Sequence, residues 1–268
     1  MRLLRSPAWA SLCALGCTCS FAGCGTPAAS DAGDAASDDG GESVDPAAPD
    51  KGPWVLRVDT TRATVRWESK AAPPVVAVDY APAAGGATST TTGSSRATTV
   101  TASYGVGLIR PPDEAGTFYL NDVDLTGLAP ASCYDYTVVD FPSATGRVCT
   151  MHEEADRTNP IRFMAIGDTN PILGNTAMIL AHVLALDPEF IVHAGDIQYY
   201  SSIFESWQAW FGLMAPMLRS GPMLAAVGNH EDELNNMEFA DYYGRLWDQP
   251  AFDGDVHRYH FASGGVHF

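Results

Sequence analysis

The most informative stretch is Phe190-Ile191-Val192-His193-Ala194-Gly195-Asp196-Ile197-Gln198-Tyr199, because an apolar run ends there in a turn that carries oxygen-bearing side chains. Two other apolar runs end in the same way. Residues 161–166 run into Gly167-Asp168, and residues 222–227 run into Gly228-Asn229-His230-Glu231. The pattern predicts three buried strands, each with a polar side chain at its carboxyl end, which is the edge where open α/β sheets bind ligands.

Four side chains at these strand ends could bind a metal. Asp168, Asp196, Tyr199 and Asn229 all offer hard oxygen donors, which suit cations such as Fe(III), Mn, Mg or Zn. Each of them alone would be an ordinary turn, capping or core residue, since Asp, Asn and Gly are frequent in turns. Their recurrence behind three separate strands favours a metal site.

The composition restricts the partners. The chain has 268 residues with 15 Lys+Arg and 32 Asp+Glu, a formal net charge of −17. Such a field repels phosphate backbones, so no nucleic-acid partner is expected. It also opposes a phosphorylated substrate unless bound cations reverse the local sign, as a dinuclear site would.

The N-terminal residues predict export. Residues 1–24 have a basic start and a short apolar core at 8–15, and Phe21-Ala22-Gly23-Cys24 resembles a bacterial lipobox. We therefore expect a lipoprotein-type signal peptide and a lipid anchor on the bacterial cell envelope, periplasmic or at the cell surface; the alternative is ordinary cleavage near Ala28 and secretion. Residues 25–52, which are almost all Ala, Gly, Ser, Asp and Pro, predict a disordered acidic linker.

Residues 53–155 predict an all-β module. Strands are expected at 63–68, 76–80 and 118–125, and the Ser/Thr/Gly-rich stretch 85–101 would be a loop or a weak edge hairpin. The segment 128–138 resembles the fibronectin type III turn, which implies a β-sandwich with Tyr134 as its tyrosine-corner residue.

Two cysteines of this module form a disulfide candidate. Cys133 and Cys149 are an even pair in a chain expected to be exported. A simple hairpin around the loop 140–146 does not place them opposite each other, so the bridge is left open.

Residues 156–268 predict alternating strands and helices, which is typical of a parallel α/β layer. One helix would bury Ile179, His182, Val183 and Leu186, and Asp187-Pro188 would end it. A second helix, 203–218, would bury Trp207, Trp210, Phe211 and Met214. A third is expected over 234–246, and two short strands at 259–261 and 266–268.

The three strand-end segments resemble three of the five motif blocks of the purple acid phosphatases, within the calcineurin-like metallophosphoesterases. The blocks are Gly167-Asp168, Gly195 to Tyr199 and Gly228 to Glu231. The resemblance implies a fibronectin type III-like β-sandwich followed by an α/β metallophosphoesterase domain. Asn170 departs from the family, which usually has Gly at that position.

The resemblance also implies a role for each matching residue. Asp168 and Tyr199 would hold Fe(III), Asp196 would bridge both metals, and Asn229 would bind a divalent metal such as Fe, Zn or Mn. Phosphate esters would be hydrolysed by in-line attack of metal-bound hydroxide. His230 would be the general acid, and Glu231 would orient His230.

The two later blocks of that family, Val-x-x-His and Gly-His-x-His, do not follow Glu231. We therefore expect a C-terminally truncated domain, half of an αββα sandwich, that has little or no turnover by itself. One alternative is a non-catalytic surface lipoprotein or binding protein with a degenerate phosphoesterase domain. Another is a metallophosphoesterase outside the purple subgroup that uses two divalent metals.

Overall fold

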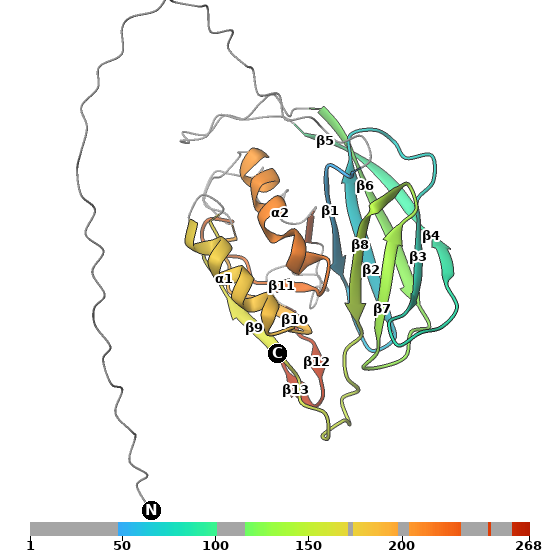
Figure 1. Ribbon diagram of the computed structural model, residues 1–268. Helices are drawn as coiled ribbons and strands as arrows, with labels where there is room; N and C mark the ends of the chain where they lie inside the picture. The colour runs from blue at the N-terminus through green and yellow to red at the C-terminus, as the bar shows by residue number, and fades with distance from the viewer. Residues whose placement is uncertain (1–47, 101–115, 171–173, 198–203, 232–245, 248–258) are drawn as a thin grey trace, which may run out of the picture. The chain divides into compact units, whose positions relative to one another are not determined.

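The structure is a computed structural model that describes residues 48–100, 116–170, 174–197, 204–231, 246–247 and 259–268 (Figure 1). All of these residues belong to one compact unit, Val44–Phe268. The expected signal peptide, most of the linker and the helix expected at 234–246 lie outside the described residues, except for the last position of that helix. Among the described residues, no helix has both the length and the apolar character to span a membrane.

The first part of the chain forms two antiparallel four-stranded sheets. In spatial order, the strands of the first sheet are β1 (Lys51–Leu56), β2 (Arg62–Ser69), β6 (Gly116–Thr126) and β5 (Ser94–Val100). Those of the second sheet are β4 (Ser89–Thr92), β3 (Ala77–Pro82), β7 (Cys133–Val138) and β8 (Phe141–Cys149). The strands expected at 63–68, 76–80 and 118–125 are therefore confirmed as the centres of β2, β3 and β6.

The two sheets share one hydrophobic core. Val65 and Val123 from the first sheet are fully buried with Val78 and Val148 from the second. Val65 lies between Thr64 and Arg66, and Val123 lies between Asp122 and Asp124, so one face of each strand is apolar. The two sheets therefore pack face to face through these residues.

The first strand begins earlier than the composition indicated. β1 starts at Lys51, inside the segment expected to be a linker, and the Lys51 side chain is buried. Its ammonium lies 2.6 Å from the Glu68 carboxylate and 3.0 Å from that of Asp50. A buried ammonium requires such partners, and they tie the start of β1 to β2.

The prediction that 85–101 is a loop or one edge hairpin was wrong. β4 pairs with β3 in the second sheet, and β5 pairs with β6 in the first. The chain changes sheets at Gly93, where a Cβ would overlap the carbonyl oxygen of Asp122. Only glycine permits this close approach of two backbones.

The structure contains the disulfide between Cys133 and Cys149. The simple hairpin register was wrong, because the two cysteines are direct partners across β7 and β8. The turn lies at Val139-Asp140, and the register shifts between Thr137 and Val138, where residues 142–144 are extra. A bulge of this kind leaves no clear pattern in the sequence.

Tyr134 makes the contact expected of a tyrosine corner. Its hydroxyl accepts the backbone N–H of Ala129 at 2.8 Å. The two sheets and this contact agree with the expected β-sandwich, and its assignment as fibronectin type III-like stays a prediction.

The second part of the chain alternates strands and helices, as predicted. Its elements are β9 (Phe163–Ile166), α1 (Gly174–Ala185), β10 (Phe190–His193), α2 (Phe204–Leu218) and β11 (Met223–Ala225). The three strands form a parallel sheet in the order β11-β10-β9 (Figure 1). A hairpin follows, β12 (Ala262–Ser263) and β13 (Val266–His267), with the first strand shorter and later than expected.

The two helices differ in how well the sequence predicted their buried faces. In α2, Trp207, Trp210, Phe211 and Met214 are all buried, as expected. In α1 the buried side chains are Thr176, Leu180 and Val183, whereas Ile179 is 54% and Leu186, just past its end, 65% exposed. The expected face, which included the exposed His182, was wrong, because α1 is apolar on nearly every side and its pattern does not select one.

α2 also packs against the first β-sheet. The rings of Trp54 in β1 and Phe211 in α2 have centroids 4.8 Å apart, and Trp207 and Trp210 belong to the same core. The Trp54 indole N–H donates to the carbonyl oxygen of Leu246 at 3.0 Å. The helix behind the candidate site is thus fixed on both sides by tertiary packing.

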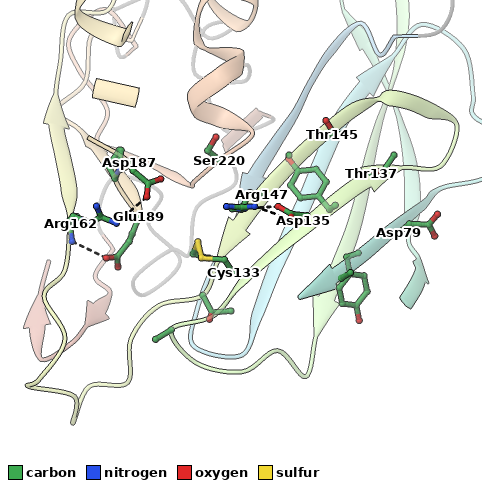
Figure 2. Close-up of a pocket in the computed structure, with 18 of the residues that line it drawn as sticks. Asp79, Cys133, Asp135, Thr137, Thr145, Arg147, Arg162, Asp187, Glu189 and Ser220 are labelled. Carbon is green, nitrogen blue, oxygen red and sulfur yellow. Dashed lines mark hydrogen bonds and ion pairs between the residues drawn. A yellow bond between two sulfur atoms is a disulfide. The ribbon is translucent and has the colours of Figure 1, made fainter. Parts of the chain in front are cut away.

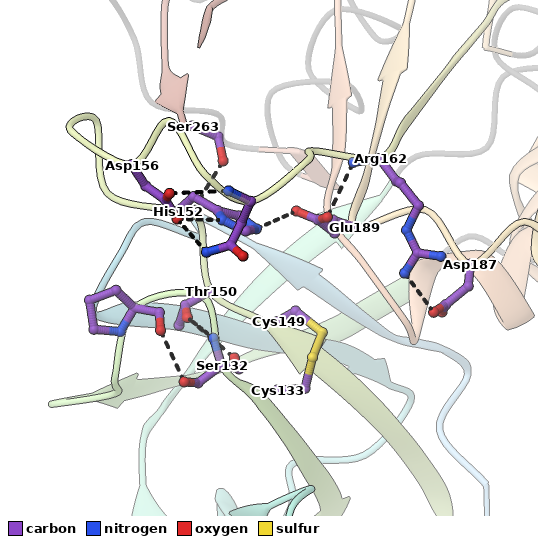
Figure 3. A network of polar contacts seen from close by, with 12 residues as sticks. Ser132, Cys133, Cys149, Thr150, His152, Asp156, Arg162, Asp187, Glu189 and Ser263 are labelled. Atoms are coloured by element: carbon purple, nitrogen blue, oxygen red, sulfur yellow. Dashed lines mark hydrogen bonds and ion pairs between the residues drawn. A yellow bond between two sulfur atoms is a disulfide. The ribbon is translucent and has the colours of Figure 1, made fainter. Parts of the chain in front are cut away.

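A polar network joins the segment after β8 to the α/β sheet (Figure 3). The ring nitrogens of His152 lie 3.3 Å from Asp156 and 3.1 Å from Glu189, just before β10. The His152 backbone N–H donates to the hydroxyl of Ser263 in β12. Because its two ring nitrogens face different carboxylates, His152 connects the segment after β8 to the segment before β10.

Candidate metal centre

The three parallel strands deliver the predicted residues to one edge of the sheet. In the strand register, His193 at the end of β10 is the partner of Ile166 in β9 and of Ala225 in β11. Asp168, Asp196 and Asn229 follow these strand ends by two, three and four residues. Three of the four predicted metal ligands therefore lie beyond the same carboxyl edge.

Both aspartates have an uncommon backbone conformation. The φ angles are +56° at Asp168 and +52° at Asp196, in the left-handed region, and Gly195 has φ +97°. Only a few per cent of non-glycine residues have a positive φ angle. Backbone strain of this kind often occurs at functional sites. Two of them, at equivalent strand ends, indicate turns built to aim particular side chains.

The two aspartate turns are hydrogen-bonded to each other. The Asp168 N–H donates to the carbonyl oxygen of Gly195 at 3.3 Å, and the Thr169 N–H donates to that of Asp196 at 3.2 Å. The turns after β9 and β10 thus form one unit, and the backbones that carry the two carboxylates have a fixed spacing.

The third turn joins this unit through Asp196 and Gly228. The backbone N–H of His230 donates to Asp196 Oδ1 at 3.2 Å. A Cβ at Gly228 would overlap the backbone nitrogen and Oδ1 of Asp196, and one at Gly195 would lie 2.6 Å from the Gly228 Cα. Both glycines therefore let the second and third turns touch.

The buried Glu231 carboxylate links the second and third turns by hydrogen bonds to their backbones. Its Oε2 accepts the N–H groups of Gly228 at 2.7 Å and Asp196 at 2.8 Å, and its Oε1 accepts the Ile197 N–H at 2.8 Å. Burial raises the pKa of the Glu231 carboxyl, although these three donors favour its charged form. The structure thus gives Glu231 a backbone-binding role, and the expected orientation of the His230 ring stays a prediction.

Sequence reasoning missed a second polar cluster behind the turns. Thr169, His193 and Trp210 are buried, and the Thr169 hydroxyl contacts both other side chains at 2.9 Å. The available signal was a histidine in the apolar strand Phe190 to His193, because a buried polar group requires a partner.

The donor set suits a hard cation. Asp168 and Asn229 are exposed and Asp196 and His230 are half-buried, so two carboxylates and an amide oxygen border the same edge. Tyr199, the fourth predicted ligand, lies outside the described residues. Within the described part of the chain, no cluster of three or more His, Cys, Asp or Glu could hold a metal. The fit therefore rests on oxygen donors, two of them acidic.

A cavity of about 860 Å³ lies elsewhere, between β7, β8 and the segment before β10 (Figure 2). The two arginines that line this cavity form ion pairs with neighbouring aspartates. Arg147 contacts Asp135 at 2.6 Å, and Arg162 contacts Asp187 at 3.2 Å. None of the predicted site residues lines it, so we assign it no part in the chemistry.

Comparisons with known proteins identify relatives of this chain. Residues 161–267 match the calcineurin-like phosphoesterase family. Over 181 residues the chain is 26% identical to purple acid phosphatase 15 and 25% identical to purple acid phosphatase 23, both of Arabidopsis thaliana. These alignments cover 56% of this chain and 34% and 39% of the relatives.

A solved structure shows the same fold. The purple acid phosphatase PPD1 from yellow lupin (Lupinus luteus) seeds has a TM-score of 0.58 over 78% of this chain and 42% of its own, at 16% identity. The matches to the curated relatives span about a quarter to two fifths of the length of those relatives. The resemblance indicated by the three motif blocks is confirmed for the domain, while the expected iron, export signal and lipid anchor stay predictions.

Proposed function

We propose that this chain contributes Asp168, Asp196, Tyr199 and Asn229 to the dinuclear metal site of a phosphoesterase of the purple acid phosphatase type. The observation that carries the proposal is the convergence of Asp168, Asp196 and Asn229 on one strand edge of a calcineurin-like phosphoesterase domain. The net charge of −17 supports it, because a phosphate ester approaches such a protein only where cations reverse the field.

Each ligand has a distinct part in this proposal. Asp168 and Tyr199 would hold Fe(III), Asp196 would bind both metals, and Asn229 would bind the divalent one, which would be Fe, Zn or Mn. The metal pair, when bound, supplies Lewis acidity that polarises a phosphoryl oxygen and makes water a better nucleophile. The mutual hydrogen bonds of the Asp168 and Asp196 turns keep the two carboxylates from separating.

His230 is the proposed general acid. Its backbone N–H donates to Asp196 Oδ1, and it lies on the turn that also carries Asn229, which supports a place for His230 beside the proposed metal site. A protonated imidazole there can give its proton to the oxygen of the departing alcohol. In a longer enzyme that carries the two later motif blocks, replacing His230 with Gln should therefore lower kcat more than it changes metal affinity.

The alternatives differ in observable ways. A non-catalytic surface lipoprotein is not favoured, because the matched family consists of phosphoesterases. A site with two divalent metals would lack the visible absorption of a Tyr199 phenolate on Fe(III). A visible absorption band that is present in the iron-loaded wild-type chain and lost in the Tyr199→Phe variant would support Fe(III). An iron-loaded wild-type chain without such a band would refute the Tyr199–Fe(III) assignment.

Metal binding by the full chain tests the proposal. Calorimetric titration with Mn²⁺ should show binding that Asp196→Asn weakens at least about tenfold. The control is Asp187→Asn, because Asp187 also has a positive φ, +49°, but its side chain is 85% exposed and lies outside the site. An Asp196→Asn chain that binds Mn²⁺ as tightly as the control would contradict the proposal.

We also propose that the protein is exported and anchored through a lipid on Cys24. The support is the sequence of residues 1–24 alone. Expression with a labelled fatty acid in a bacterial host should label the wild-type protein and the Cys19→Ala control. Label that persists in Cys24→Ala would argue against the anchor.

A further inference from the structure

A buried polar cluster lies directly behind the two aspartate turns. His193 and Trp210 are fully buried and Thr169 is nearly so. They come from the end of β10, from α2 and from the turn after β9. The side chains of two of them, His193 and Trp210, converge on the Thr169 hydroxyl, which therefore joins three elements of the domain.

The hydrogen bonds fix the position of every proton in this cluster. The Gly195 N–H donates to His193 Nδ1 at 3.2 Å, so Nδ1 carries no proton and the ring proton is on Nε2. The His193 Nε2–H donates to the Thr169 hydroxyl oxygen at 2.9 Å. The Trp210 indole N–H donates to the same oxygen, also at 2.9 Å. The hydroxyl itself donates to the carbonyl oxygen of Ile197 at 2.8 Å. Thr169 thus uses both lone pairs and its only proton.

These bonds act on the backbone of the candidate metal ligands. Thr169 follows Asp168, while Gly195 and Ile197 flank Asp196. Residues at positive φ persist only where the surroundings determine them, and this cluster contacts both strained turns. The Thr169 hydroxyl is therefore linked, through His193 and the Ile197 carbonyl, to the turn that carries Asp196, while Thr169 itself follows Asp168.

We propose that Thr169, held by His193 and Trp210, is a positioning residue that sets the geometry of Asp168 and Asp196 for cation binding. The cation part of this inference rests on the proposed function, whereas the positioning of the turns does not. A valine has nearly the shape of threonine but no hydroxyl, and serine retains the hydroxyl. The pair Thr169→Val and Thr169→Ser therefore separates hydrogen bonding from packing.

Amide hydrogen exchange tests the positioning without any metal. Exchange at Asp196 and Ile197, whose N–H groups donate to Glu231, should be about tenfold faster in Thr169→Val and near wild type in Thr169→Ser. The matched control is Thr150→Val, because Thr150 is also buried with a hydroxyl bonded to two backbone groups, in the β module. Equal exchange in Thr169→Val and the control would overturn the proposal.

Mn²⁺ titration of the same chains tests the effect on the cation. Affinity should fall about tenfold in Thr169→Val, recover in Thr169→Ser and stay unchanged in Thr150→Val. Unchanged affinity in a folded Thr169→Val would overturn the cation part of the inference. If the wild-type chain binds no Mn²⁺, the proposed function fails instead, and the exchange rates still decide whether Thr169 positions the turns.

A third measurement remains decisive if Thr169→Val does not fold. The ¹⁵N spectrum of the wild-type His193 ring should show a protonated Nε2 and a bare Nδ1, and the opposite tautomer would contradict the cluster. His193→Asn retains an acceptor for Gly195 but does not reach Thr169. It should therefore accelerate exchange at Asp196 as Thr169→Val does, and wild-type exchange would count against the proposal.

Discussion

Replacing Glu231 with Gln should destabilise the protein far more than the loss of one charge at a surface. Glu231 accepts two N–H groups on Oε2 and one, from Ile197, on Oε1. A glutamine can retain its oxygen at only one of these places. The arrangement that retains two bonds points the amide NH₂ at the Ile197 N–H, so that two donors face each other and a fully buried residue loses its acceptor.

The magnitude follows from these three bonds. An orphaned buried N–H costs about 1–3 kcal/mol, and each of the two remaining bonds weakens by roughly 1 kcal/mol when its acceptor loses its charge. The neutral amide is cheaper to bury, which offsets part of the loss, consistent with the raised pKa of the Glu231 carboxyl. The net loss in free energy of unfolding should be about 2–4 kcal/mol.

Urea unfolding of the full chain measures this loss. The control is Glu154→Gln, the same chemical change at a side chain that is 66% exposed and forms an ion pair with the exposed His267. The control should stay within about 0.5 kcal/mol of wild type. A Glu231→Gln variant as stable as Glu154→Gln would refute the structural role inferred for this carboxylate.

Three further predictions concern other parts of the chain. Burial lowers the pKa of His193 from 6.5 to about 4, so the unfolded state binds the extra proton first and the free energy of unfolding falls as pH drops below 6.5. Urea unfolding should show a loss of about 2–3 kcal/mol between pH 7 and 4.5. His193→Gln should remove this part of the pH dependence. Gly228→Ala adds a Cβ that would overlap Asp196, so it should lower the free energy of unfolding by at least about 1–3 kcal/mol, measured by thermal unfolding. The control Gly212→Ala, in open space on α2, should stabilise slightly. Equal melting temperatures would contradict the close approach of Gly228 to Asp196. Cys133→Ala removes the disulfide and leaves Cys149 reduced. It should lower the free energy of unfolding by about 3 kcal/mol, given the sequence separation of 16 residues, and leave Mn²⁺ affinity unchanged. A changed affinity would argue against separate roles for the β module and the site.

The sequence predicted the strands and the edge where the ligands gather, because both depend on local patterns. Alternating apolar residues located β2, β3 and β6, and apolar runs that end in Gly-Asp or Gly-Asn located the carboxyl ends of β9, β10 and β11. The burial of the tryptophans in α2 followed from their helical spacing. These features need no knowledge of distant contacts.

The remaining features depend on contacts between segments far apart in the chain. The face of α1 was mispredicted because its apolar residues surround the helix, so the neighbours decide which side is buried. Glu231 bonds backbone groups 34 and 35 residues away, and backbone donors leave no sequence signal. The proton order at Thr169 likewise required three separate elements to be in place. Sequence patterns therefore found the candidate ligands but not the groups that hold them.

Anomalous X-ray scattering from a crystal of the chain grown with iron and zinc would locate the metals that this strand edge binds. Data recorded at the iron and zinc absorption edges should place metal peaks within coordination distance of Asp168, Asp196 and Asn229. The iron peak should also contact Tyr199. Metal peaks bound elsewhere, with these four side chains uncoordinated, would contradict the account.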